Sequence, residues 1–283
     1  MGIFDFLKSN RNVENDNGFN KTYEENGTYQ VGNKVNGENQ GEWQYFNKEG
    51  KIITEIEFNN GKIINMKSFH PNGKLQNDIP IKNKVANGLK KEYDENGVLI
   101  AELNMKEGQL HGLTKKYFEN GSIESERMFK NDKQHGSYKS FHENSQLKFS
   151  GSYKDHMKSG FWKGYNENGV LIEETNWKDD ELDGLNKEYY DTGELLFEYK
   201  YSNGKKVGKS TAYHKNGKKK MQANYKDGNI DGLMKMWHES GKLFVEQKQD
   251  GEKRLYSKAW DEDGELVFHE LDGKTIINNL EKN

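Results

Sequence analysis

The sequence has no cysteine and only two prolines among its 283 residues. Without cysteine the chain has no disulfide bond, no thiolate nucleophile and no cysteine-ligated metal site, and the composition indicates a reducing, cytoplasmic location. The formal net charge is only -3, from 43 Lys and Arg against 46 Asp and Glu. So small a net charge gives no electrostatic reason to expect nucleic acid as a partner.

Apolar residues are also scarce, at 31% of the chain, and they form no run of about 18 residues that could span a membrane. The N-terminal residues Met1–Asn10 lack the apolar region and cleavage site of a signal peptide. Aromatic residues nevertheless make up 12% of the sequence, which is high for a disordered chain. We therefore expect a folded protein whose apolar content is concentrated in large rings.

A turn glycine recurs about every 24 residues along most of the chain. The series is Gly27, Gly50, Gly73, Gly97, Gly121, Gly169, Gly193, Gly217, Gly241 and Gly264, with Ser145 filling the one gap. An aromatic residue stands four positions before each member from Gly50 onwards, as at Phe46 and Tyr117. An aliphatic residue usually stands two positions after it, and a large apolar residue such as Phe58 eight positions after it.

A second turn follows ten or eleven positions after the glycine, as in Asn60-Gly61 and Asp227-Gly228, so each repeat reads as a β-hairpin. A three-residue turn that ends in a left-handed glycine would pair the aromatic four before the glycine with the aliphatic two after it. We expect this turn to gather all three apolar columns on one face of the sheet. The opposite face would carry acidic residues five after the glycine and lysines nine after it, as at Glu55 and Lys106.

The repeats predict an all-β protein, an elongated antiparallel β-meander of about ten 24-residue hairpins that occupies residues 19–274. Residues 1–18 are expected to form a short helix and a polar linker, and residues 275–283 a C-terminal capping segment. Apolar groups such as Ile3 with Leu7, and Ile276 with Leu280, suit short capping helices that cover the ends of the sheet.

Units such as Gly184-Leu-Asn-Lys-Glu-Tyr189-Tyr-Asp-Thr-Gly193-Glu-Leu195 and Tyr225-Lys-Asp-Gly228 resemble MORN repeats. They are most similar to the bacterial variant, with its Tyr-x-x-Asn-Gly-x-Leu-x-x-Glu-x-x-Tyr-Lys-Asn-Gly pattern, and the resemblance covers roughly residues 20–274. It implies a β-hairpin array that acts as a binding scaffold for a protein partner. Because bacterial proteins of this variant are often antitoxins or immunity proteins, it also implies a toxin as that partner, neutralised by steric occlusion.

The residues that could carry chemistry repeat too regularly to form one site. His70, His142, His214 and His238 share the position three before the turn glycine, and neighbours in such a column lie two strands apart, roughly 9.6 Å, too far to share a zinc ion. The segment Gly204–Ser210 imitates a phosphate-binding loop but lies between two expected strands. We therefore expect no enzymatic activity, no cofactor and no metal.

Three large rings lie outside the apolar columns: Trp43, Tyr138 and Trp162, each seven positions before the turn glycine or Ser145. Regular alternation assigns them to the charged face, although the repeat glycine two residues before each can shift the register. Exposed Trp and Tyr on a charged face suit a protein interface. We predict protein binding at these three residues.

Two other functions remain open from the sequence. A membrane-associated tether would use residues 1–11 with a basic cluster formed by Lys205, Lys206, Lys209, Lys215, Lys218, Lys219 and Lys220. A structural homo-oligomer would instead pack the apolar faces of two chains together.

Overall fold

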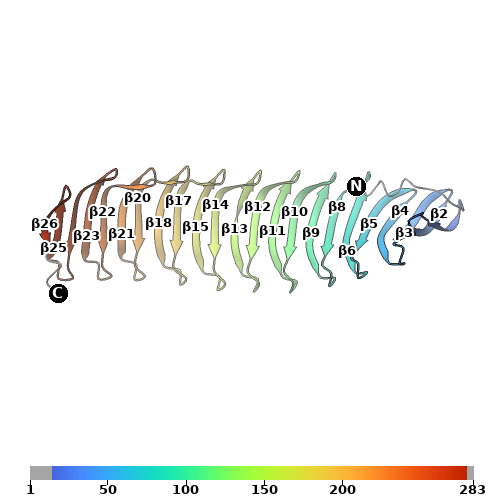
Figure 1. The fold of residues 1–283 in the computed structure, drawn as a ribbon, viewed down its shortest axis with the longest axis horizontal. Coiled ribbons are helices and arrows are strands. Elements are labelled where there is room, and N and C mark those ends of the chain that lie inside the picture. The colour runs from blue at the N-terminus through green and yellow to red at the C-terminus, as the bar shows by residue number, and fades with distance from the viewer. Residues whose placement is uncertain (1–14, 279–283) are drawn as a thin grey trace. The chain divides into compact units, whose positions relative to one another are not determined.

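The computed structural model describes residues 15–278, which contain 26 β-strands and no helix (Figure 1). The chain divides into two compact units, residues 1–134 and residues 135–283. Unit 1 holds β1 (Gly18–Tyr23), β2 (Tyr29–Val35), β3 (Glu38–Phe46), β4 (Ile52–Asn59), β5 (Lys62–Phe69), β6 (Leu75–Lys82), β7 (Val85–Ala86), β8 (Gly88–Tyr93), β9 (Leu99–Lys106), β10 (Gln109–Tyr117) and β11 (Ile123–Lys130).

Unit 2 begins within β12 (Lys133–Phe141). It continues with β13 (Leu147–Lys154), β14 (Met157–Tyr165), β15 (Leu171–Lys178), β16 (Glu181–Leu182), β17 (Gly184–Tyr189), β18 (Leu195–Ser202), β19 (Lys205–Lys206), β20 (Gly208–Tyr213), β21 (Lys219–Lys226), β22 (Asn229–Trp237), β23 (Leu243–Asp250), β24 (Lys253–Trp260), β25 (Leu266–Leu271) and β26 (Lys274–Asn278). Inside each unit, strands that follow one another pair antiparallel, with β7, β16 and β19 as short pieces. The predicted all-β antiparallel meander of hairpin repeats is confirmed.

The first turn of each repeat has the predicted bulged form. The Gly50 N–H donates to the carbonyl of Asn47 at 3.0 Å, the Asn47 N–H donates to the carbonyl of Lys51 at 2.9 Å, and Gly50 has a φ of 77°. Phe46 is the register partner of Ile52, as expected. A positive φ disfavours residues with a side chain, which explains why glycine recurs here.

The second turn is a two-residue hairpin turn with positive φ at both positions. Asn60 and Gly61 have φ values of 49° and 69°, and Asn131 and Asp132 hold 49° and 64° without glycine. Asn and Asp tolerate this left-handed region best after glycine, and the turn matches the twist of the strands that it joins. Ser145, which replaces a glycine of the first turn, likewise has a φ of 66°.

The prediction that all three apolar columns share one face is wrong. Tyr45 faces Thr54 while Phe46 faces Ile52, so Ile53 is an extra residue that shifts the register of β4. Two successive side chains at such a bulge fall on the same side, and the alternation restarts with opposite parity. The aromatic column of Phe46 and the aliphatic column of Ile52 therefore lie on one face of the sheet, and the column of Phe58 lies on the opposite face.

We call the two faces the core face and the ion-pair face. The core face of unit 1 carries a cluster of five buried hydrophobic residues: Trp43, Tyr45, Ile56, Phe58 and Met66. The ion-pair face carries cross-strand pairs between the acidic column and lysines of an adjacent strand: Lys67–Glu55 at 2.6 Å, Lys163–Glu174 at 3.5 Å, Lys187–Glu198 at 3.7 Å and Lys235–Glu246 at 2.9 Å. Aromatic residues of the turn column also lie there, since the Tyr117 hydroxyl donates to Glu102 Oε2 at 2.9 Å.

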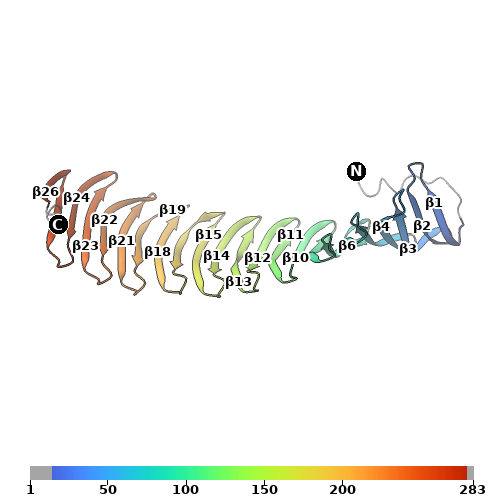
Figure 2. The ribbon, with the colours of Figure 1, turned by 60° about the horizontal axis from the view of Figure 1, so that its bottom comes forward.

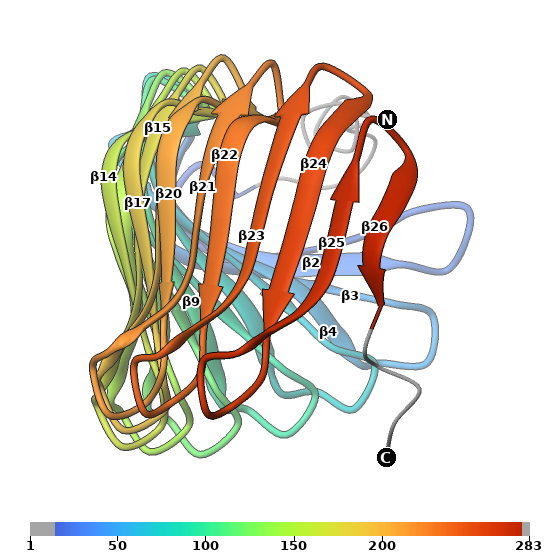
Figure 3. The same cartoon turned by 90° about the vertical axis from the view of Figure 1, so that its left-hand side faces the viewer.

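The strands within each unit are bent along their length (Figures 2 and 3). Bending crowds the side chains on the inner side of a sheet. On the core face of unit 2 the small residues Ser210, Ala212 and Ala223 are almost completely buried, each about 1% exposed. Larger residues on the same face are buried as well, such as Tyr199, which is 9% exposed.

The two predicted caps have different outcomes. The N-terminal segment 1–14, with Ile3 and Leu7, lies outside the described residues. At the other end, residues 274–278 form strand β26 rather than a helix, because Asp272 and Gly273 make one more two-residue turn with φ values of 47° and 75° and return the chain along β25. The array thus continues into the predicted capping segment as far as residue 278, and residues 279–283 lie beyond the described part.

Candidate functional site

Trp43 is buried in unit 1 and is not available as an exposed contact. Only 3% of its surface is exposed, its ring packs edge-on against Phe58 at 6.3 Å between centroids, and its indole Nε1–H donates to the carbonyl of Asn33 at 3.0 Å. The predicted exposure of this residue is wrong. The repeat glycine Gly41, with a φ of 68°, takes part in a register shift between β2 and β3 that turns Trp43 to the core face.

Trp162 and Tyr138 come together on the core face of unit 2. Their ring centroids are 5.4 Å apart, and both contact Tyr153, at 5.1 Å from Trp162 and 5.6 Å from Tyr138. Trp162 is 4% exposed and Tyr138 is half-buried, so the predicted exposed patch is an aromatic cluster of the core instead. A register shift between β13 and β14, beside Gly160, reverses the expected face of Trp162.

Trp43 and Trp162 each lie flat on a glycine of the preceding strand. A Cβ atom at Gly32 would stand 2.2 Å from Trp43 Cδ2, and one at Gly151 would stand 2.1 Å from Trp162 Cδ2. Neither glycine has a positive φ, so it is the indole ring that requires the missing side chain. The sequence carries a signal for this contact, because each tryptophan follows its glycine by the same eleven positions.

Two lysines of unit 2 lie over pairs of rings on the core face. Lys158 Nζ is 4.8 Å from the Trp162 ring centroid and 4.4 Å from that of Trp177. Lys206 Nζ is 3.7 Å from the Tyr199 ring, and burial lowers the pKa of this lysine. Cation–aromatic contacts of this kind are stronger where water is excluded.

Between these lysines, two glutamates of neighbouring strands face each other. Glu173 of β15 and Glu188 of β17 are register partners on the core face. Burial raises the pKa of Glu173 above its usual value, Lys158 opposes the shift and the charge of Glu188 adds to it. Sequence reasoning missed this pair, because neither glutamate belongs to the acidic column. The sequence does carry a signal for the pair: Glu173 stands four positions after the turn glycine Gly169, and Glu188 stands five positions before the next turn glycine, Gly193.

Several buried polar atoms on the core face of unit 2 have no hydrogen-bond partner within the described residues. Asn186 is 4% exposed and its Oδ1 accepts the Asn176 N–H at 2.6 Å, but its Nδ2 has no hydrogen-bond partner among residues 15–278. Trp162 Nε1 and Ser210 Oγ are likewise buried and have no hydrogen-bond partner among the described residues. An unpaired buried donor costs roughly 1–3 kcal/mol, so this part of the core face is less satisfied than an ordinary strand surface.

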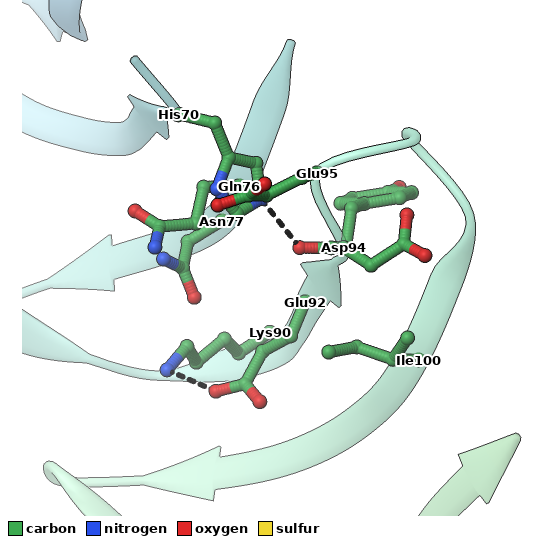
Figure 4. A pocket seen from close by; sticks show the side chains of 9 residues that line it. His70, Gln76, Asn77, Lys90, Glu92, Asp94, Glu95 and Ile100 are labelled. Atoms are coloured by element: carbon green, nitrogen blue, oxygen red, sulfur yellow. Dashed lines mark hydrogen bonds and ion pairs between the residues drawn. The ribbon is translucent and has the colours of Figure 1, made fainter. Parts of the chain in front are cut away.

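Unit 1 has a hollow of about 560 Å³ near the turns of β5–β9 (Figure 4). It is lined by His70, Gln76, Asn77, Lys90, Glu92, Tyr93, Asp94, Glu95 and Ile100. Lys90 and Glu92 form an ion pair at 2.7 Å on its wall. The backbone N–H of Val98, 2.8 Å from an Asp94 carboxylate oxygen, lowers the pKa of Asp94.

The histidine column joins neighbouring repeats. Nε2 of His70, His142 and His214 lies 2.8–2.9 Å from the carbonyl of the turn-column aromatic in the next repeat, at Tyr93, Tyr165 and Trp237. Since a carbonyl can only accept, Nε2 carries the proton in each case. Asparagines two positions after these histidines also join neighbouring repeats; for example, Asn216 Nδ2 donates to the Glu239 carbonyl at 2.9 Å. Within the described range no three His, Asp or Glu side chains lie together as metal ligands would.

The basic cluster named from the sequence is only partly an open surface. Lys206 is half-buried over Tyr199, whereas Lys209 is exposed. Lys218 Nζ donates to the Ser240 carbonyl at 2.7 Å and so links two turns. Residues 15–278 contain no helix that could cross a bilayer.

Comparison with solved structures gives only remote likeness. A chain in the crystal structure of TcdB2-TccC3-Cdc42 is 13% identical over 82% of this chain, and one in the structure of the Photorhabdus luminescens Tc holotoxin pore with the TccC3-D651A mutation is 13% identical over 87%. The TM-score is 0.18 in both cases, too low to establish a shared overall arrangement, and this chain spans only 15% and 16% of their lengths. No curated protein matches the sequence.

The repeats themselves match a family model. The model of the MORN repeat variant matches nine segments, residues 39–60, 64–83, 86–107, 110–131, 134–155, 160–179, 182–203, 206–227 and 230–248. These segments cover more than half of the chain and follow the hairpins of both units. The chain is therefore a repeat scaffold that belongs to the MORN repeat variant family.

Proposed function

We propose that this chain is a non-enzymatic, cytoplasmic scaffold that binds a protein partner through the core face of its sheet. The observation that carries the proposal is that no helix covers this face in the described part of either unit, although large rings and charged groups lie on it. Its rings, such as Trp43 and Trp162, are buried among their neighbours, so the groups that a partner can contact there include exposed charged residues such as Glu188. The cysteine-free sequence supports the cytoplasmic location.

The repeat construction favours binding over catalysis. Neighbouring hairpins are joined by turn-to-turn hydrogen bonds whose donor differs between repeats, such as His142, Tyr190 and His214, and these bonds tie the turns of each hairpin to the next. A preorganised surface loses little side-chain entropy when a partner docks. A standard protein interface needs about 800 Å² on each side, which several adjacent hairpins of one unit can supply.

The finer form of the proposal is that the partner is a toxin, whose active or docking surface the sheet covers. The support for it is the similarity of the repeats to those of bacterial antitoxin and immunity proteins. Steric occlusion requires no chemistry from the scaffold, only contact area and shape.

Photocrosslinking in cells tests which face binds. A photoreactive residue is placed at Glu92 or Glu188 on the core face, and at the adjacent Lys91 or Lys187 on the ion-pair face as matched controls. We expect one protein to crosslink at the core-face positions and not at the controls. Crosslinks confined to Lys91 and Lys187, or only lipid adducts at all four positions, would overturn the proposal.

The toxin form has its own readout. The crosslinked protein, expressed alone, should arrest growth of the host cell, and co-expression of this chain should restore it. A partner that leaves growth unchanged would show a scaffold without toxin neutralisation.

A further inference from the structure

One cross-strand row on the core face of unit 2 is apolar from β18 to β25. Its members are register partners from each strand to the next: Phe197, Ala212, Met221, Met236, Val245, Ala259 and Phe268, on β18 and β20 to β25. We call these residues the apolar row. Neighbouring strands lie about 4.8 Å apart, so the row spans roughly 29 Å along the array.

The same level of the sheet is polar in other repeats. In the preceding hairpins of unit 2 it holds the register partners Glu173 and Glu188. In unit 1 the equivalent row runs through Thr54, Ser68, Asn77 and Glu92. Hairpins of this kind fold with polar side chains at these positions, so the fold alone does not require the apolar row.

The apolar row is only partly covered. Ala212 is buried, and the other six members are half-buried. No helix within residues 15–278 lies over the row. Ala212 and Ala223 are about 1% exposed although no second layer covers them, as expected on the inner side of bent strands (Figure 3). The row therefore presents apolar side chains to a partner on an inwardly curved surface.

Three methionines lie together in the middle of this surface. Met221 and Met236 are register partners, and Met234, two residues before Met236 on the same face, is the register partner of Ala223. Methionine side chains are unbranched and adapt to the shape of an apolar partner. Surfaces rich in methionine take up the apolar face of amphipathic helices.

Lysines line the turn-side edge of the row beside the methionines. Lys215 and Lys218 stand in the turn between β20 and β21, Lys220 lies at the start of β21, and Lys242 stands in the turn between β22 and β23. All four are exposed, and Lys218 and Lys242 donate to backbone carbonyls rather than to carboxylates. Glu239 is the one acidic residue of these two turns. The middle of the edge is therefore positively charged.

The two ends of the same edge are acidic. The turn before β18 carries Asp191 and Glu194, and the turn before β25 carries Asp261, Glu262, Asp263 and Glu265. The charge beside the apolar row thus changes from negative to positive and back to negative. A partner that matches it has acidic groups in its middle and basic groups at both ends.

We infer that the apolar row is the docking site for an amphipathic helix of the protein partner, with a polar flank that is acidic in its middle and basic at both ends. The inference rests on the proposed function. At 1.5 Å per residue, a helix that spans the row needs about 19 residues. Its apolar stripe at i, i+3, i+4 and i+7 meets the row along this whole length.

Other occupants match the surface less well. An extended peptide turns every second side chain away from the sheet. A flat bilayer does not follow an inwardly curved face, and the acidic turns repel anionic lipid. A second copy of the chain brings the same charge pattern, so that like charges meet across the contact.

A peptide titration tests the site. The probe is an acetylated and amidated 18-residue helical peptide with a leucine stripe, three glutamates in its middle turns and three lysines divided between its two ends. The first control exchanges the glutamates and lysines, which keeps composition and net charge. The second control places a proline in the middle of the probe, which breaks the helix.

The signals followed are the methyl resonances of the methionines in the full chain, labelled with ¹³C. We expect saturable shifts at Met221, Met234 and Met236 with the probe. Met66, which is 7% exposed in unit 1, should not shift. Binding of either control should be at least tenfold weaker.

Variants assign the binding to the row. The double variant Met221→Gln, Met236→Gln keeps the length of both side chains and should weaken probe binding at least tenfold, because two amide groups would be buried against leucines. Leu233→Gln, on the opposite face of β22, should leave binding unchanged. Thermal melts show whether each variant is folded. The exposed pair Lys215→Gln, Lys220→Gln should reduce the preference for the probe over its charge-exchanged control.

Several results would overturn the inference: equal binding of either control peptide, equal binding by the methionine double variant, or no saturable shift up to about 1 mM probe. The same methionine shifts with vesicles of phosphatidylserine and phosphatidylcholine, or on dilution of the chain alone, would assign the row to lipid or to a second copy. If Glu188 still crosslinks a protein while the probe does not bind, the proposed function stands and the docking site is a different part of the core face.

Discussion

Replacing Gly151 with alanine should destabilise unit 2, although alanine is ordinarily better than glycine inside a strand by about 0.5–1 kcal/mol. The backbone at Gly151 does not require glycine, since its φ is not positive. The new methyl group, however, would stand 2.1 Å from Trp162 Cδ2. Because no carbon atoms can approach so closely, the indole ring must leave its place.

The cost can be bounded from the packing of Trp162. Overpacking a core costs about 1–3 kcal/mol, and complete loss of a buried tryptophan costs about 3–5 kcal/mol. Since Trp162 is 4% exposed and lies against Tyr138 and Tyr153, we expect a loss of about 1–3 kcal/mol for Gly151→Ala. Each kcal/mol lowers the Tm of a unit this size by about 2–4 °C.

The assay is chemical unfolding followed by tryptophan fluorescence, with a double-mutant cycle as its control. Trp162→Ala alone is costly, but adding Gly151→Ala to it should cost nothing, because the ring that the methyl group would meet is gone. The reasoning is refuted if Gly151→Ala is as stable as the natural chain, or if it costs the same in both backgrounds. Gly32→Ala should repeat the effect in unit 1 through Trp43.

Three further predictions concern hydrogen bonds and charges. Tyr117→Phe removes the hydrogen bond to Glu102 and should cost about 0.5–1.5 kcal/mol of unfolding free energy in a urea melt. Burial, together with that hydrogen bond, raises the pKa of Tyr117 to about 12. The natural chain should therefore lose stability as the pH rises from 10 towards 12, and the variant should lose less. Because its pKa is raised, Glu173 binds its proton more tightly in the folded state, so this proton contributes stability at low pH that is lost as the pH rises above 4.5. Glu173→Gln should remove this pH-dependent part of the stability. A variant with the same pH profile as the natural chain would contradict the raised pKa. His214→Leu leaves the Trp237 carbonyl without its donor and should cost about 1–3 kcal/mol, measured as faster hydrogen exchange at the adjoining turns. Protection from exchange equal to that of the natural chain would contradict the role of the histidine column in joining neighbouring repeats.

The turns and strands could be predicted from the sequence because each is a local property. Glycine at Gly50 and Asn60-Gly61 specifies turn geometry within a few residues, and the repeat multiplies the signal. The faces could not be predicted, because one extra residue at Ile53 reverses the parity of everything that follows in the strand. Alternation shows which residues share a face only until the first bulge.

The candidate site was hidden for a related reason. Trp162 was identified correctly as unusual, yet its environment depends on Gly151 in the preceding strand, a contact that no local pattern shows. Glu173 and Glu188 lie in separate repeats, and only their register pairing reveals that they oppose each other. Residues that break the repeat carried the information about the site, while those that keep it described the scaffold.

The turn-to-turn hydrogen bonds have a consequence for the length of the array. Every such bond joins residues about 23 positions apart, as from Asn144 to Glu167, so contacts are local and folding can begin at several points. Removing residues 170–193 would bring Glu194 directly after Gly169 and let β14 pair with β18 in the register that β15 now occupies. A chain built in this way can be shortened or lengthened by whole 24-residue steps with the same kind of strand pairing at each joint, so the length of its binding surface and its stability both change with the number of repeats.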